Sequence, residues 1–103
     1  MIYATMIGLP AQDTLEVFSL FGISPCKAKV VFECGDVPPT LRISQDSGGV
    51  SVGPLLPVRE VYADGSVVVA QGSIDTDTDP VYIFNSSGGD ASSTLYIAIY
   101  PRD

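Results

Sequence analysis

The chain has 103 residues, with Lys+Arg 5 against Asp+Glu 12, a formal net charge of -7, and no His or Trp. A chain of this length supports one hydrophobic core, so we expect residues 1–103 to form a single domain. A hydrophobic content of 46% with only 17% charged residues excludes a disordered chain.

Charge and residue types exclude several classes of function. Five basic residues cannot neutralise a run of phosphates, so neither nucleic acid nor an anionic membrane is an expected partner. The lack of His excludes Ser-His-Asp and Cys-His catalysis and imidazole metal ligands. No apolar run reaches about 18 residues, and Lys27 is the first basic residue. We therefore expect no transmembrane segment, no signal peptide and synthesis in a cytoplasm.

Short β-rich runs separated by Gly and Pro predict strands in the first half of the chain. These runs are Ile2 to Ile7, Thr14 to Phe21, Cys26 to Cys34 and Leu41 to Gln45. Asp46 to Gly49 then predicts a turn, with Gly supplying positive φ. The next stretch, Val50 to Pro57, contains Gly53, Pro54 and Pro57. Because Pro cannot donate to a ladder, we expect an edge segment or a crossing loop there.

The second half predicts two hairpins. Val58 to Tyr62 and Ser66 to Ala70 flank Asp64-Gly65, a strong hairpin signal that predicts positive φ at Gly65. Val81 to Asn85 is expected to pair with Thr94 to Tyr100 across a polar, glycine-rich loop. Together the runs predict an all-β fold, a single antiparallel β-sandwich or jelly-roll-like domain of about seven to eight short strands.

The two cysteines bracket one predicted strand. In an extended chain the Cα atoms of Cys26 and Cys34 would lie about 26 Å apart, and a disulfide needs less than about 7 Å. We therefore expect two free thiols, as in a reducing compartment. A redox pair would need a turn between them, and Lys27 would point away from a reactive Cys26.

The last predicted strand is apolar on both faces. Leu95, Ile97 and Ile99 share one face, and Tyr96, Ala98 and Tyr100 share the other. A two-layer sandwich buries only one face, so the second needs a cover. That cover could be the Val50 to Pro57 loop, or the tyrosines could simply be exposed. Alternatively, the second face is a subunit or partner interface. That interface would contain Tyr96 and Tyr100 and would be extended by Tyr82 and Phe84 on the partner strand.

Three carboxylates alternate along Asp75, Asp77 and Asp79, which suggests a Ca²⁺ site. An EF-hand loop starting at Asp75 would require Gly at position 80 and Glu at position 86, where the chain has Pro80 and Ser86. We therefore expect a solvated acidic loop with no obligatory metal. No pair of acids stands out as catalytic, and the Gly-rich stretches lack the Lys of a phosphate loop. We expect no cofactor and no enzymatic activity.

Two passages carry a resemblance to a known class of proteins. They are Leu41-Arg42-Ile43-Ser44-Gln45-Asp46-Ser47-Gly48-Gly49 and Pro80-Val81-Tyr82-Ile83-Phe84-Asn85-Ser86-Ser87-Gly88-Gly89-Asp90-Ala91. With them, the short acidic β-domain resembles the small virion proteins of tailed bacteriophages, notably head decoration or cement proteins. The resemblance implies a sandwich or jelly roll on the capsid surface, present as a homodimer or homotrimer that braces the major capsid protein.

We therefore expect a non-enzymatic structural protein, located in the virion and made in the host cytoplasm. The alternative is a carbohydrate- or ligand-binding β-sandwich, in which loop tyrosines stack on a sugar and calcium could assist. The two would be separated by measuring the oligomeric state of the chain purified alone and its binding to isolated capsids.

Overall fold

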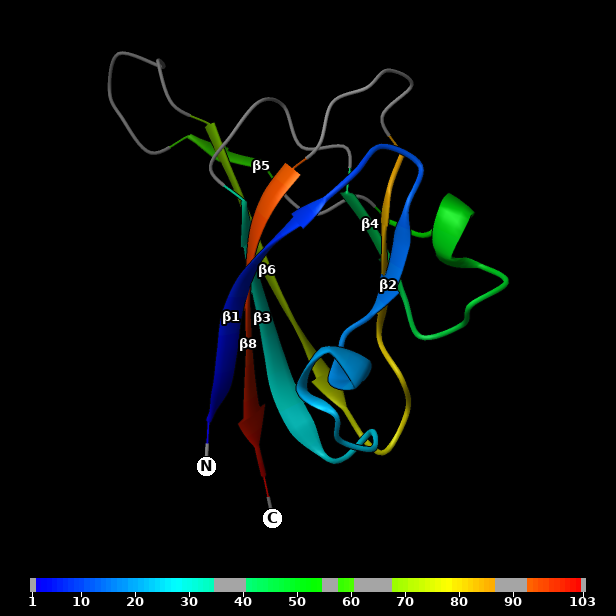
Figure 1. Cartoon of the computed structure of the whole chain (residues 1–103), viewed down its shortest axis with the longest axis vertical. Coiled ribbons are helices and arrows are strands. Elements are labelled where there is room, and N and C mark those ends of the chain that lie inside the picture. Colours follow the sequence, from blue (N-terminus) through cyan, green and yellow to red (C-terminus); the bar gives the residue numbers. More distant parts are fainter. Residues whose placement is uncertain (1, 35–40, 55–57, 61–67, 87–92, 103) are drawn as a thin grey trace.

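The computed structural model describes residues 2–34, 41–54, 58–60, 68–86 and 93–102. Two antiparallel sheets lie face to face, as Figure 1 shows, and the described residues contain no α-helix. The all-β sandwich prediction is confirmed. The five-stranded sheet has the order β1 (Tyr3–Leu9), β8 (Ser93–Pro101), β3 (Ala28–Cys34), β6 (Val68–Thr76) and β5 (Val58–Glu60). The three-stranded sheet has the order β2 (Thr14–Glu16), β7 (Tyr82–Asn85) and β4 (Leu41–Ser44).

The core lies between the sheets and follows from the two-residue period of a strand. Strand β3 buries alternate side chains and exposes or half-exposes the rest. Strand β8 buries Leu95, Ile97 and Ile99 on its inner face, and β7 contributes Ile83 from the opposite sheet. The other buried apolar side chains that complete the core are Leu9, Val17, Phe18, Ala28, Val30, Phe32, Cys34, Leu41 and Val81.

The strand expected over Thr14 to Phe21 is wrong beyond Glu16. A 3₁₀ helix, η1 (Phe18–Phe21), follows β2 and ends at Gly22, whose φ is 66°. The Glu16 carboxylate accepts hydrogen bonds from the backbone N–H groups of Phe18 at 3.0 Å and Ser19 at 3.1 Å. These side-chain bonds give the backbone an alternative to the ladder, which ends the strand and turns Phe18 into the core.

The expected final hairpin is also wrong. Strand β7 lies between β2 and β4 in one sheet, whereas β8 lies between β1 and β3 in the other. A strand with two apolar faces suits a central position, and β8 pairs on both sides, with Ile99 opposite Tyr3 and Val30. The chain from Asn85 to Ser93 is long enough, at about 3.3 Å per residue, to connect sheets about 10 Å apart.

The remaining expected elements are close to those observed. Antiparallel pairing of β5 with β6 confirms the pairing of the central hairpin, while its turn and Gly65 lie outside the described residues. The second strand was expected to end at Ala70 but continues to Thr76, because it pairs along its length with β3 as well. The strand expected from Cys26 begins at Ala28. The turn after β4 forms with Gly49 N–H donating to Asp46 O at 3.0 Å. The Asp46 side chain accepts a bond from the Gly48 N–H at 3.1 Å, but neither Gly48 nor Gly49 has the positive φ that we expected.

The segment expected over Val50 to Pro57 as an edge segment or crossing loop is described as far as Pro54, and that part lies along the smaller sheet. Residues Val50–Val52 form a 3₁₀ helix, η2, which contacts β4 and β7 and lies on the side of the smaller sheet facing away from the larger one (Figure 1). The Ile43 N–H donates to Pro54 O at 3.1 Å, and Arg42 Nη1 donates to Gly53 O at 2.7 Å. Residues 53–54, the edge strap, therefore cover the free side of β4.

Candidate interaction surface

The outer face of the five-stranded sheet carries an apolar surface, which we call the outer patch. Register places Ala98 between Ala4 and Val31, and places Tyr96 between Met6 and Glu33. Alternation puts these side chains on the face opposite Leu95, Ile97 and Ile99. The outer patch consists of Ile2, Ala4, Met6, Val31, Tyr96, Ala98 and Tyr100.

Exposure varies across the outer patch. Ile2 is 62% exposed, Met6 65% and Tyr100 38%, while Tyr96 is half-buried. Ala98 is 0% exposed although alternation places it on the outer face. The register therefore confirms that β8 has a second apolar face. The most exposed side chains of the outer patch, Met6 and Ile2, lie beside β8 at the margin formed by the first strand.

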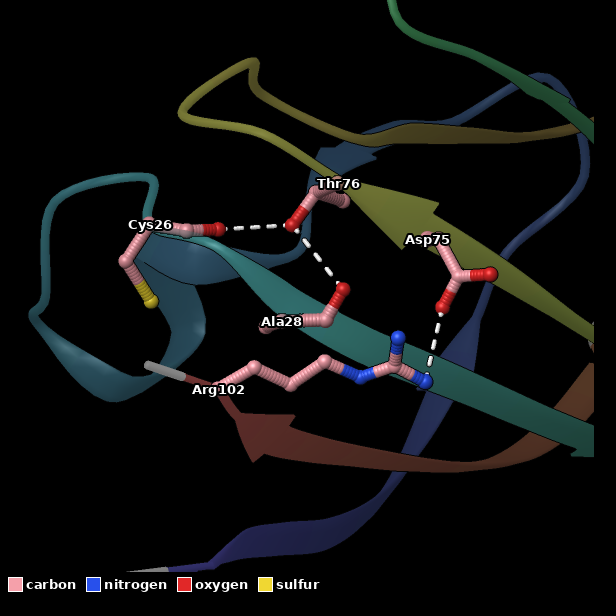
Figure 2. A network of polar contacts seen from close by, with 5 residues as sticks. All are labelled: Cys26, Ala28, Asp75, Thr76 and Arg102. Atoms are coloured by element: carbon pink, nitrogen blue, oxygen red, sulfur yellow. Dashed lines mark hydrogen bonds and ion pairs between the residues drawn. The ribbon is translucent and has the colours of Figure 1, made fainter.

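Charged residues border the outer patch on β3 and β6. Lys29 pairs in register with both Tyr100 and Asp75. Asp75 Oδ1 also lies 3.0 Å from Arg102 Nη2, as Figure 2 shows, with the two side chains 70% and 49% exposed. Such an exposed ion pair contributes little to stability. These charges mark where the apolar surface ends.

A buried threonine fixes the end of the sheet that carries Tyr100. Thr76 is 5% exposed, and its hydroxyl lies 2.6 Å from Cys26 O and 3.3 Å from Ala28 O (Figure 2). The Arg102 N–H donates to Lys27 O at 2.8 Å on the other side of the same segment. The residues before β3 are therefore hydrogen-bonded to the chain segments on both of its sides.

A shallow depression adjoins the outer patch between β3 and β6. It has a volume of about 370 Å³ and is lined by Lys29, Val31, Gln71, Gly72 and Ser73. Lys29 also pairs in register with Tyr100, which lies on β8, the neighbour of β3 on the side away from β6. The hollow is where a small polar ligand would have hydrogen-bonding groups within reach.

The four residues predicted at an interface divide between two faces. Tyr96 and Tyr100 belong to the outer patch. Tyr82 and Phe84 are half-buried on the outer face of the smaller sheet, where alternation places them opposite the buried Ile83. The expectation of one patch fails because it assumed pairing of β7 with β8. A loop cover does exist, but η2 and the edge strap lie on the smaller sheet instead of over β8.

The loop expected over Asp75, Asp77 and Asp79 is wrong at Asp75, which belongs to a strand because it pairs with Lys29 of β3, and the three carboxylates are not gathered. Asp75 lies inside β6, whereas Asp77 and Asp79 are exposed in the turn that follows. Thr78 has φ 71°, which interrupts the extended alternation that would have placed the three on one side. Among the described residues no group of three His, Cys, Asp or Glu side chains could hold a metal ion.

Cys26 and Cys34 are not joined by a disulfide, as predicted. Cys34 is buried in the core, and Cys26 is half-buried before β3.

Sequence reasoning missed Ile2 and Met6 as surface residues. The signal was present, since Ile2, Ala4 and Met6 alternate with Tyr3, Thr5 and Ile7 and leave both faces of the first strand largely apolar. The same reasoning that singled out Tyr96 and Tyr100 identifies Met6.

Comparisons with protein-family models, with curated proteins and with solved structures found no match. Within the described residues, no helix has the length and apolar character needed to cross a membrane.

Proposed function

We propose that this protein is a non-enzymatic structural subunit that binds a large assembly through the outer patch, as a decoration protein binds a phage head. The observation that carries the proposal is the exposed apolar surface of Ile2, Met6 and Tyr100 on a regular sheet. Contiguous exposed apolar surface marks contact sites in small domains.

The chemistry of the outer patch suits binding to a broad, flat surface. Burial of apolar area contributes roughly 25 cal/mol per Å² before the costs of association. Tyr96 and Tyr100 would bury their rings while their hydroxyls find partners at the rim. A net charge of -7 opposes association between acidic proteins, so the driving force must come from this apolar area. In the virion setting, the major capsid protein would supply the opposing surface.

Binding to isolated phage heads tests the proposal. Tyr96→Asp with Tyr100→Asp places two carboxylates in the outer patch and should abolish co-sedimentation with heads. A matched control, Ser51→Asp with Val52→Asp, makes the same charge change at exposed positions of η2 and should bind like the wild type. Circular dichroism should find both variants folded. The proposal would be refuted if the wild-type protein bound no head preparation, or if the double tyrosine variant still bound.

The depression between β3 and β6 favours a second candidate function, recognition of a carbohydrate. Its polar lining could hydrogen-bond a sugar whose ring stacks on an aromatic side chain of the outer patch. A glycan array distinguishes the two functions, because sugar binding lost in Lys29→Ala would support the second candidate. Head binding that persists in that variant and disappears in the double tyrosine variant would support the first.

A further inference from the structure

The edges of the two sheets differ in how they are protected against pairing with another chain. An exposed strand edge presents unpaired N–H and C=O groups, and proteins block such edges with charges, Pro, bulges, short strands or a covering loop. The edge strap covers β4 through the bonds of Ile43 and Arg42. Strand β2 has three residues and is followed by η1, and β5 has three residues that include Arg59 and Glu60.

Strand β1 has none of these protections among the described residues. It is seven residues long, and no described strand lies on the side away from β8. From Ile2 to Ala11 there is no charged residue, and the first Pro is Pro10, beyond the strand. Its register with β8 runs from Tyr3 to Leu9 without a skipped residue, so no bulge bends it away. The Leu9 carbonyl accepts a bond from the Asn85 side chain at 2.9 Å, which occupies one end of the edge only.

The structure assigns this edge to a second copy of the chain. We propose that β1 pairs antiparallel with β1 of another copy about a twofold axis, giving one continuous sheet of ten strands. This inference rests on the proposed function, for which it names the self-contact. An antiparallel edge is self-complementary, because each strand offers the same alternation of donors and acceptors to its twofold mate.

Charge favours a second copy over an acidic or basic partner. Every charged residue lies outside Ile2 to Ala11, so two copies that each carry -7 meet where neither contributes a charge. The pairing would also place Ile2, Ala4 and Met6 of both copies side by side. Two outer patches would then merge into one apolar surface of twice the width, suited to the flat partner surface proposed above.

Light scattering combined with hydrogen exchange tests the pairing. The wild type should show twice the chain mass of 10.8 kDa at high concentration and dissociate on dilution. Within Tyr3–Leu9 alternate amides already face β8, and edge pairing should slow exchange of the remaining, free-edge amides by about tenfold or more as the dimer forms. Stacking of outer patches would also give a dimer, but it would leave the free-edge amides of β1 exchanging as in the monomer.

A substitution on the edge completes the test. Met6→Glu adds a carboxylate at a side chain that is 65% exposed, so the core is untouched, and it should give a monomer at concentrations where the wild type is dimeric. Val52→Glu makes the same change at an 80% exposed side chain of η2 and should remain dimeric. A wild-type monomer, or a dimer whose free-edge β1 amides stay unprotected, overturns the inference. A monomer that still binds heads would overturn the pairing alone, and a β1-paired dimer that ignores heads would overturn the proposed function alone.

Discussion

Replacing Gly53 with Ala should release the edge strap from β4. Gly53 has φ -66° and ψ 170°, which any residue can adopt, so the substitution has no conformational cost. A Cβ atom at this position would lie 2.3 Å from the Ile43 carbonyl oxygen and 3.2 Å from its carbonyl carbon. Both are backbone atoms of a strand paired with β7, so β4 cannot move aside and the strap must lift.

Lifting the strap removes two hydrogen bonds. The backbone bond from Ile43 to Pro54 contributes about 1 kcal/mol, and the charge-assisted bond from Arg42 to Gly53, which is only partly buried, about 1–2 kcal/mol. We expect Gly53→Ala to lower the free energy of unfolding by about 2–3 kcal/mol, in the range measured for overpacking. For a domain of this size that corresponds to a fall in Tm of roughly 10–20 °C.

Two other glycines provide controls for the urea or thermal melt. Gly8 has open space around a built Cβ and no positive φ, so Gly8→Ala should be neutral or slightly stabilising. Gly22 also has open space but a φ of 66°, so Gly22→Ala should cost about 1 kcal/mol through backbone strain alone. A Gly53→Ala protein as stable as Gly8→Ala would show that the strap does not hold the β4 edge. The β4 edge could then no longer be contrasted with the β1 edge as a protected one.

Three further predictions concern buried polar groups, thiols and metal binding. Thr76→Val keeps the shape of the side chain but removes the hydroxyl that donates to Cys26 O and Ala28 O. A denaturant melt should show the free energy of unfolding lowered by about 1–3 kcal/mol, and Thr76→Ser should recover most of that loss. Alkylation of the native protein, followed by mass spectrometry, should label half-buried Cys26 well before buried Cys34. Denatured protein should take two labels without reductant. Equal rates of alkylation for the two thiols in the native protein would contradict the burial of Cys34. Calorimetry with Ca²⁺ should detect no binding tighter than about millimolar, and a tight site abolished by Asp77→Asn would contradict the dispersed arrangement of the acidic segment.

Local patterns in the sequence determined the fold class, most strand positions and the two-faced character of the last strand. Alternation of apolar residues is a property of a few consecutive positions, so Val30 and Phe32 or Leu95 and Ile97 could be assigned to a buried face without knowing the partner strand. The free thiols followed equally well from the extended spacing of Cys26 and Cys34.

Only the tertiary structure decided which sheet each strand joins and which edges stay open. Strand pairing depends on hydrogen bonds between residues far apart in the chain, and β7 and β8, although consecutive, proved to belong to opposite sheets. That assignment separated Tyr82 and Phe84 from Tyr96 and Tyr100. It also brought Met6 beside Tyr96, a pair 90 residues apart in sequence whose contact no local period could reveal. Among the described residues the fold covers the edge of β4, through the bond of Ile43 to Pro54, and leaves the edge of β1 uncovered, a difference set by how the strands are arranged in the two sheets.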